Sequence, residues 1–120
     1  MSTAIYNLGR ILLSAIFLVA GYRMTTDFSG TVENMASKSI PFTEVMAVGA
    51  IGLQIVGGLM VATGYRPRLG AVLLLIFLIP VTVIFHPPTF PAEMMQFRKN
   101  LALMGGLFVV IGATGREARG

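Results

Sequence analysis

Polar side chains that could do chemistry are few in this chain, and most of them belong to two groups set among long apolar segments. The first group lies within such segments and consists of Asn7, Arg10, Ser14 and Gln54, of which Arg10 and Gln54 are the candidate binding residues. The second group comes from the opposite ends of the segments and consists of Arg23, Glu44, His86, Gln96 and Asn100. Arginine, histidine and asparagine donate hydrogen bonds, so these residues are candidates for binding a quinone carbonyl or a lipid phosphate. The alternative is a structural polar network that closes one end of a helix bundle.

The sequence lacks most groups that carry catalysis or hold metals. There are no cysteines, which excludes disulfides, thiolate catalysis and cysteine-based metal sites. His86 is the single histidine and has no carboxylate at metal-ligand spacing, so we expect no metal site and interpret His86 as a helix cap or as a member of the second polar group. No nucleophile-base pair, phosphate loop or carboxylate pair is visible, so we assign no catalytic residue. Enzymatic activity stays open, and any redox role would need a partner protein.

The composition indicates that lipid is the solvent for most of the chain. Of 120 residues, 55% are hydrophobic and 12% are charged, with a mean hydropathy of +0.81, whereas soluble domains carry about 25% charged residues. Four apolar segments, each near the roughly 17 to 25 residues that cross a bilayer as a helix, occupy residues 5–22, 42–63, 69–85 and 97–113. We therefore predict an all-α protein, a single transmembrane domain over residues 1–120 that forms an antiparallel four-helix bundle.

The connections between these segments have distinct characters. Residues 25–41 are polar and could hold a short interfacial helix. Gly64 suits a helix C-cap and Pro67 a helix start, which predicts a tight turn over residues 64–68. Three prolines make residues 86–95 a rigid cap, and Pro80 should kink the third span.

Charge gives a weak signal for orientation. Arg66 and Arg68 lie in the short turn, and Arg10 is near the start of the first span, so we expect both termini in the cytoplasm of a multi-pass inner membrane protein. The net charge of +4 then indicates contact with anionic lipid headgroups. No soluble basic surface is present to bind nucleic acid.

Packing and pairing can be predicted within the spans. Arg10, Ser14, Phe17 and Gly21 recur at helical spacing and predict one bundle-facing stripe. Asn100 lies about 100° around the helix from Lys99, so it can face protein while Lys99 and Arg98 reach the headgroups. The glycines expected at helix contacts are Gly57, Gly58, Gly105 and Gly106.

Arg10 has no carboxylate at its own depth in the expected topology. Gln54 is the nearest polar side chain by depth, and we expect the two to pair. A neutral amide leaves the charge uncompensated, which would draw a lipid phosphate or an acidic residue of a partner subunit.

Three stretches carry a resemblance to a known family. "RILLSAIFLVAGYRM", "LQIVGGLMVATGYRPRLGAVLLLIF" and "FRKNLALMGGLFVVIG" resemble the DoxX family of small bacterial four-helix membrane proteins. The resemblance covers nearly the whole chain and implies a four-helix transmembrane bundle, with quinone-linked or oxidant-defence oxidoreductases as partners of some relatives. Members often have a lysine where this chain has Met24 and a glutamate where it has Gln54.

Three hypotheses for function follow from these observations. The first is an accessory membrane component that associates with a redox or other membrane partner. The second is a quinone-interacting subunit of a membrane oxidoreductase, which makes a quinone the one candidate cofactor. The third is a lipid or small-solute binder or transporter, and transport would require oligomerisation to enclose a path. The expected partners are membrane lipid and either a protein subunit or further copies of this chain.

Overall fold

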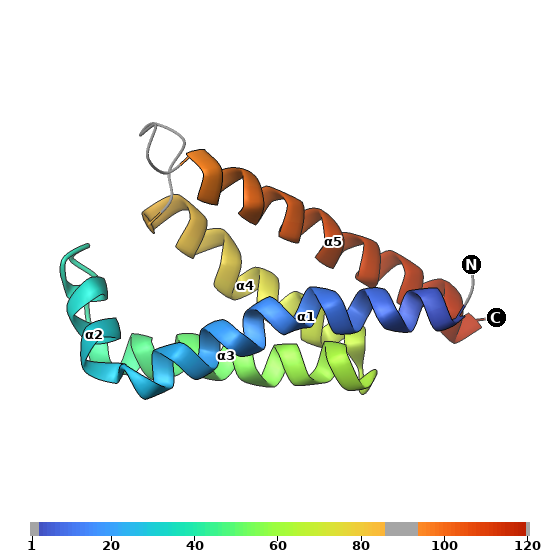
Figure 1. Ribbon diagram of the computed structural model, residues 1–120, viewed down its shortest axis with the longest axis horizontal. Helices are drawn as coiled ribbons and strands as arrows, with labels where there is room; N and C mark the ends of the chain where they lie inside the picture. Colours follow the sequence, from blue (N-terminus) through green and yellow to red (C-terminus); the bar gives the residue numbers. More distant parts are fainter. Residues whose placement is uncertain (1–2, 86–93, 120) are drawn as a thin grey trace.

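The protein is all-α over the residues that its computed structural model describes, 3–85 and 94–119, with side chains described up to residue 113 in the last helix. Five helices follow one another without a strand in this part of the chain. Their bounds are α1 Thr3–Thr26, α2 Phe28–Ala36, α3 Thr43–Thr63, α4 Pro67–Phe85 and α5 Met94–Arg119. In Figure 1 the four long helices lie roughly lengthwise and reverse direction in turn, whereas α2 sits at one end, and the start of α1 lies near the end of α5.

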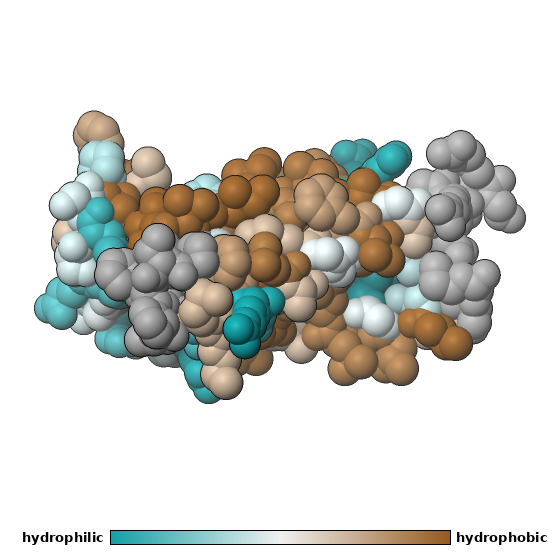
Figure 2. Space-filling view, turned by 90° about the horizontal axis from the view of Figure 1, so that it is seen from above, coloured by the Kyte–Doolittle hydropathy of each residue, from teal (hydrophilic) through white to brown (hydrophobic). Residues whose placement is uncertain are grey.

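Three of the predicted spans are confirmed as helices long and apolar enough to cross a membrane. These are α1, α3 and α4, which match the predicted segments 5–22, 42–63 and 69–85. Most large apolar side chains of these helices remain exposed outside the core, as expected where lipid surrounds them. Figure 2 shows hydrophobic residues over most of one face, with hydrophilic ones at the end where α2 lies and in smaller patches elsewhere on that face.

The fourth predicted span is confirmed as a helix but not as a membrane span. Residues 97–113 belong to α5, which is not among the sufficiently apolar helices in the described part of the chain. The reason is local, because Arg98, Lys99 and Asn100 precede an apolar run that extends only from Leu101 to Ala113. The predicted antiparallel four-helix bundle is thus confirmed only as an all-α protein with three apolar spans.

The connecting elements follow the expected turn chemistry. Asp27 is the N-cap of α2, where its carboxylate accepts a 3.3 Å hydrogen bond from the Gly30 N–H, so the chain turns directly out of α1 into the predicted short helix. Gly64 closes α3 with φ +80°, a left-handed conformation that favours glycine, and α4 begins at Pro67. Pro80 lies inside α4, and its predicted kink stays a prediction.

The core forms where α1, α3, α4 and α5 meet. The buried residues of α1 are Arg10, Ser14, Phe17 and Gly21, which confirms the predicted stripe. Phe17 packs in a cluster with Val61, Leu74 and Leu107, one from each of the other long helices. Packing is extensive between α1 and α3, α3 and α4, and α4 and α5, whereas α1 and α5 make only slight contact. Figure 1 shows α5 diverging from α1 toward the N-terminal end of α5.

Candidate functional site

Arg10 is buried at the C-terminal end of α3. One guanidinium nitrogen, Nη1, donates a 2.7 Å hydrogen bond to the Val61 carbonyl, and Nη2 donates to the Asn7 Oδ1. The guanidinium carbon lies 5.0 Å from the centre of the Tyr6 ring. Val61 belongs to the last helical turn, whose carbonyls lack intrahelical partners, and the helix dipole is negative there. Arg10 therefore caps α3 with a charge of the favourable sign.

The predicted pairing of Arg10 with Gln54 is wrong. The Gln54 Nε2 instead donates to the Met24 sulfur at 2.8 Å, so this amide joins α3 to α1. Because Gln54 lies near the middle of α3, its side chain can serve either end of the bundle, and depth alone could not decide between them. Arg10 instead donates to the unpaired main-chain carbonyl of Val61 at the end of α3. No sequence pattern identifies such a carbonyl as the partner of a given arginine.

Asn100 joins α5 to α4 through Thr82. The Asn100 Nδ2 donates to the Thr82 Oγ1 at 3.0 Å, and that hydroxyl donates to the Leu78 carbonyl at 2.8 Å. Asn100 is only 4% exposed, whereas Arg98 and Lys99 are exposed, which is the orientation predicted from their helical positions. Sequence reasoning missed Thr82, although a lone hydroxyl inside an apolar helix was a signal.

Gln54 and Asn100 line the same small cavity. It has a volume of about 160 Å³ and lies between α1, α3, α4 and α5. Apolar residues form most of its wall, and Lys99 adds a cation. The other lining residues are Ile16, Phe17, Ala20, Met24, Phe77, Leu78, Val81 and Leu103. The cavity thus combines two buried amides with walls suited to a ring or an alkyl group.

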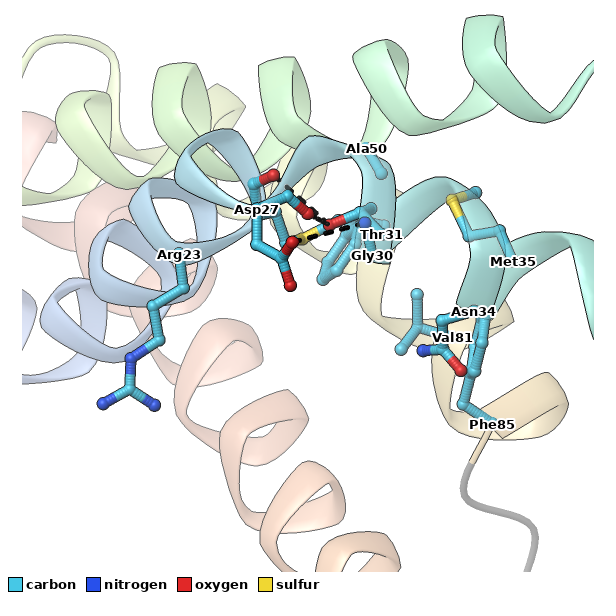
Figure 3. A pocket seen from close by; sticks show the side chains of 11 residues that line it. Arg23, Asp27, Gly30, Thr31, Asn34, Met35, Ala50, Val81 and Phe85 are labelled. Atoms are coloured by element: carbon cyan, nitrogen blue, oxygen red, sulfur yellow. Dashed lines mark hydrogen bonds between the residues drawn. The ribbon is translucent and has the colours of Figure 1, made fainter.

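A larger cavity of about 390 Å³ adjoins the first one beneath α2. Both cavities include Met24, Phe77 and Val81 in their linings, so they are neighbours that share walls. The polar lining of the larger cavity comes from Arg23, Asp27, Thr31 and Asn34. Figure 3 shows Asp27 hydrogen-bonded to the start of α2, whereas the Arg23 side chain extends away from Asp27. Both residues are exposed, so the Arg23 side chain is accessible from outside the cavity.

The five candidate binding residues that the structure describes lie at different places. Gln54 and Asn100 meet at the small cavity and Arg23 lines its neighbour, but Arg10 lies apart at the end of α3. Glu44 lines a different surface cavity, with Val32 and Ala36. Arg23 and Glu44 thus line different cavities, and α2 contributes residues to both. His86 lies outside the described residues.

The glycines expected at helix contacts behave differently from one another. A Cβ built on Gly57 would lie 3.0 Å from the Gly70 carbonyl oxygen, and one on Gly58 would lie 2.9 Å from the Leu18 side chain. At Gly106 the nearest atom would be 3.2 Å away, in Leu13. Gly105 would meet nothing within 4 Å, so the contact predicted there is not made within the described chain.

Gly70 was missed by sequence reasoning. It faces the Gly57 carbonyl oxygen, so glycines of α3 and α4 bring the two backbones together. Gly70 is a single glycine near the start of α4. A single glycine does not indicate a helix contact unless the neighbouring helix is known.

Comparison with known proteins agrees with this architecture. The sequence model of the DoxX family matches residues 5–87. Inner membrane protein YphA of Escherichia coli (strain K12) is 27% identical over 117 residues, which cover 92% of this chain and 83% of the relative. Inner membrane protein YqjF of the same organism is 30% identical over 110 residues, covering 91% and 82%. No solved structure matches the chain. The family match over most of the chain, together with these two relatives and the three apolar spans, means that this protein belongs to the DoxX family.

Proposed function

We propose that this protein is an accessory component of the inner membrane that binds an amphipathic small molecule and associates with a membrane partner. The observation that carries the proposal is the pair of adjoining cavities. Their linings pass from a polar rim with Arg23 and Asp27, through shared apolar walls, to the buried amides of Gln54 and Asn100. A molecule with a polar head and an apolar body would match these adjoining polar and apolar surfaces.

The partner supplies whatever chemistry follows binding. Within the described residues there is no group of three or more histidine, cysteine, aspartate or glutamate side chains able to hold a metal. Cysteine is absent from the whole sequence. A redox reaction of a bound molecule would thus depend on electron carriers of another subunit. The quinone-interacting subunit of an oxidoreductase is the specific form of this function that the buried amides favour, because amides can hydrogen-bond the oxygens of a quinone ring.

The proposed topology has four crossings, with α5 as the last. At 26 residues α5 is about 39 Å long, enough to span a hydrocarbon core of about 30 Å. It packs along α4, and the snorkelling side chains of Arg98 and Lys99 would place its polar first turns among the headgroups. The exposed arginines Arg66, in the turn before α4, and Arg68, in the first turn of α4, favour a cytoplasmic location for this end of the bundle and for both termini.

The test is to identify what the protein carries from its own membrane. The protein would be purified in mild detergent, and bound lipids and quinones would be extracted and quantified by mass spectrometry. Val81→Trp would fill space in both cavities, whereas Val83→Trp places the same side chain at a position that is 67% exposed. We expect the parent and Val83→Trp to retain one enriched amphiphile that Val81→Trp loses while keeping its helical content. Equal recovery from both variants would refute ligand binding in these cavities.

A further inference from the structure

An open groove lies where α4 begins and α5 packs beside it. It has a volume of about 560 Å³, and none of its lining residues belongs to the two cavities described above. Two arginines, Arg66 and Arg68, line it near the turn. The rest of its lining is apolar and consists of Pro67, Leu69 and Val72 of α4 and Ile111 of α5. The groove therefore presents an apolar wall made by two helices, with two cations at one end.

Neither of these guanidinium groups is occupied by the protein itself. Arg66 and Arg68 are both exposed. Within the described part of the chain, neither side chain donates a hydrogen bond or forms an ion pair. Arg66 contacts only the ring of Tyr65, with 5.6 Å between the guanidinium carbon and the ring centre. Both groups are thus available to an anion from outside the chain.

The surrounding charge favours such an anion. The carboxylates with described side chains, Asp27, Glu33 and Glu44, belong to α2 or its flanks, at the opposite end of α3 from the turn. Arg10 adds a third cation close to the turn, because a Cβ built on Gly64 would lie 2.8 Å from its Nη1. Its hydrogen bonds go to uncharged acceptors, and its buried Nε has none. Beyond residue 113 the sequence adds two arginines and one glutamate, so the balance stays positive.

The position of the groove along the helices suits a phospholipid. Both α3 and α4 are long and apolar enough to cross a membrane, so the short turn between them would lie at the level of the headgroups. The apolar wall at Leu69 and Val72 then begins on the hydrocarbon side of the two arginines. A phospholipid has the same order of surfaces, a phosphate followed by acyl chains. Guanidinium groups match phosphate oxygens in geometry as well as in charge.

We propose that this groove binds one anionic phospholipid of the surrounding membrane. Its phosphate would lie between Arg66 and Arg68, and one acyl chain would follow Leu69, Val72 and Ile111. The lipid would contact α4 and α5 together, and so hold the C-terminal part of α5 against the start of α4. This site is separate from the amphiphile cavities and does not depend on the proposed function.

The experiment counts lipids on the purified protein. Delipidated protein in mild detergent would be titrated with dioleoyl phosphatidylglycerol or with dioleoyl phosphatidylcholine, and bound lipid would be counted by native mass spectrometry. The acyl chains are identical, so a difference reports the head group. We expect one phosphatidylglycerol to bind at least about tenfold more tightly than phosphatidylcholine, with a preference that falls as salt is added.

Two pairs of substitutions test the cations. Arg66→Gln combined with Arg68→Gln should abolish the preference for phosphatidylglycerol. Lys38→Gln combined with Arg98→Gln is the matched control, because it removes the same charge from two exposed positions that do not line the groove. We expect the control to keep the preference. In lipid-free detergent both double variants should melt close to the parent, since all four side chains are exposed.

Two further variants test the apolar wall. Val72→Trp would fill the groove and should weaken binding of phosphatidylglycerol by about tenfold, whereas Val83→Trp places the same side chain elsewhere on α4, at a position that is 67% exposed, and should not. Inorganic phosphate, added as a competitor, should fail to displace the lipid, because it gains nothing from the wall.

Each contrary outcome overturns the inference in a different way. Equal affinity for the two lipids would mean that the arginines select no head group. Equal losses in the two double variants would assign the preference to net charge and not to this groove. Unchanged binding in Val72→Trp, or displacement by inorganic phosphate, would mean a site for free anions. None of these results affects the Val81→Trp test of the amphiphile cavities, so the two proposals fail separately.

Discussion

The guanidinium group of Arg10 lies against the C-terminal turn of α3, where it donates a 2.7 Å hydrogen bond to the carbonyl oxygen of Val61. A buried cation thus satisfies a helix end, and it does so at the point where α1 and α3 pack. Arg10 is structural by this geometry, in contrast to the amides that line the cavity.

Replacing Arg10 should destabilise the protein. Arg10→Leu removes a charge-assisted bond and exposes an unpaired carbonyl to apolar surroundings, for an expected loss of about 2 kcal/mol. Thermal unfolding in detergent, followed by circular dichroism, measures the change. Arg66→Leu is the control because Arg66 is exposed in the turn. Equal melting temperatures for the two variants would contradict the capping role.

Gln54→Glu should lower stability. The mutation places a carboxylate beside the Met24 sulfur in a position that is 1% exposed, and the nearest expected cation, Arg10, is committed to Val61. A buried charge without a partner is costly. We expect a lower melting temperature at neutral pH in detergents with and without anionic lipid. A higher melting temperature would revive the pairing of this position with Arg10.

Asn100 and Lys99 are neighbours with opposite surroundings, which makes them a matched pair. Asn100→Leu breaks the bond to Thr82 between α5 and α4, and hydrogen bonds between membrane helices are worth about 0.6 to 1.7 kcal/mol. Lys99→Leu should change stability by less, since the side chain is exposed. The melting temperatures of the two variants provide the comparison, and a larger loss for Lys99→Leu would rule out the orientation of α5.

Gly70 and Gly105 should differ sharply in their tolerance of a methyl group. A Cβ at Gly70 would lie 2.7 Å from the Met60 Cβ and 2.9 Å from the Gly57 carbonyl oxygen, so Gly70→Ala must separate α3 from α4. Such overpacking costs about 1 to 3 kcal/mol. Gly105→Ala meets no atom within 4 Å and should leave the melting temperature of the protein nearly unchanged. Similar melting temperatures would mean that the α3–α4 contact is looser than described.

The topology can be tested with single cysteines, because the natural chain has none. Tyr65→Cys in the arginine turn, Lys38→Cys after α2 and Ala118→Cys near the end of α5 would each be treated with a membrane-impermeant maleimide in intact spheroplasts. We expect labelling of Lys38→Cys alone, because the proposed four crossings put the other two positions in the cytoplasm. Labelling of Ala118→Cys but not of Tyr65→Cys would mean that the chain crosses the membrane three times and that α5 is not a span.

Several features were predictable because they depend on local sequence. Three apolar spans follow from composition, the turn at Gly64 from backbone conformation, and the burial of Asn100 beside exposed Lys99 from helical rotation. These properties need no knowledge of a neighbouring helix.

Partner choice was not predictable, because it depends on how the helices sit against one another. Gln54 bonds to the thioether of Met24, and Arg10 bonds to a main-chain carbonyl, and neither partner is distinguished in a sequence. The separation of Glu44 from Arg23 likewise follows from the position of α2. The fourth span stays a prediction, because the polar start of α5 leaves only a short apolar run in the described part of that helix.

The slight contact between α1 and α5 has a consequence for how a ligand is supplied. The small cavity draws residues from both helices, including Ala20 of α1 and Leu103 of α5, so the seam between them lies along the cavity wall. In the proposed four-crossing topology acyl chains would surround that seam, and an amphiphile diffusing in the plane of the bilayer could approach it without entering water. Occupancy is then governed by the mole fraction of the amphiphile among the lipids and not by its aqueous concentration, so that diluting the membrane with inert lipid empties the cavity while diluting the buffer does not.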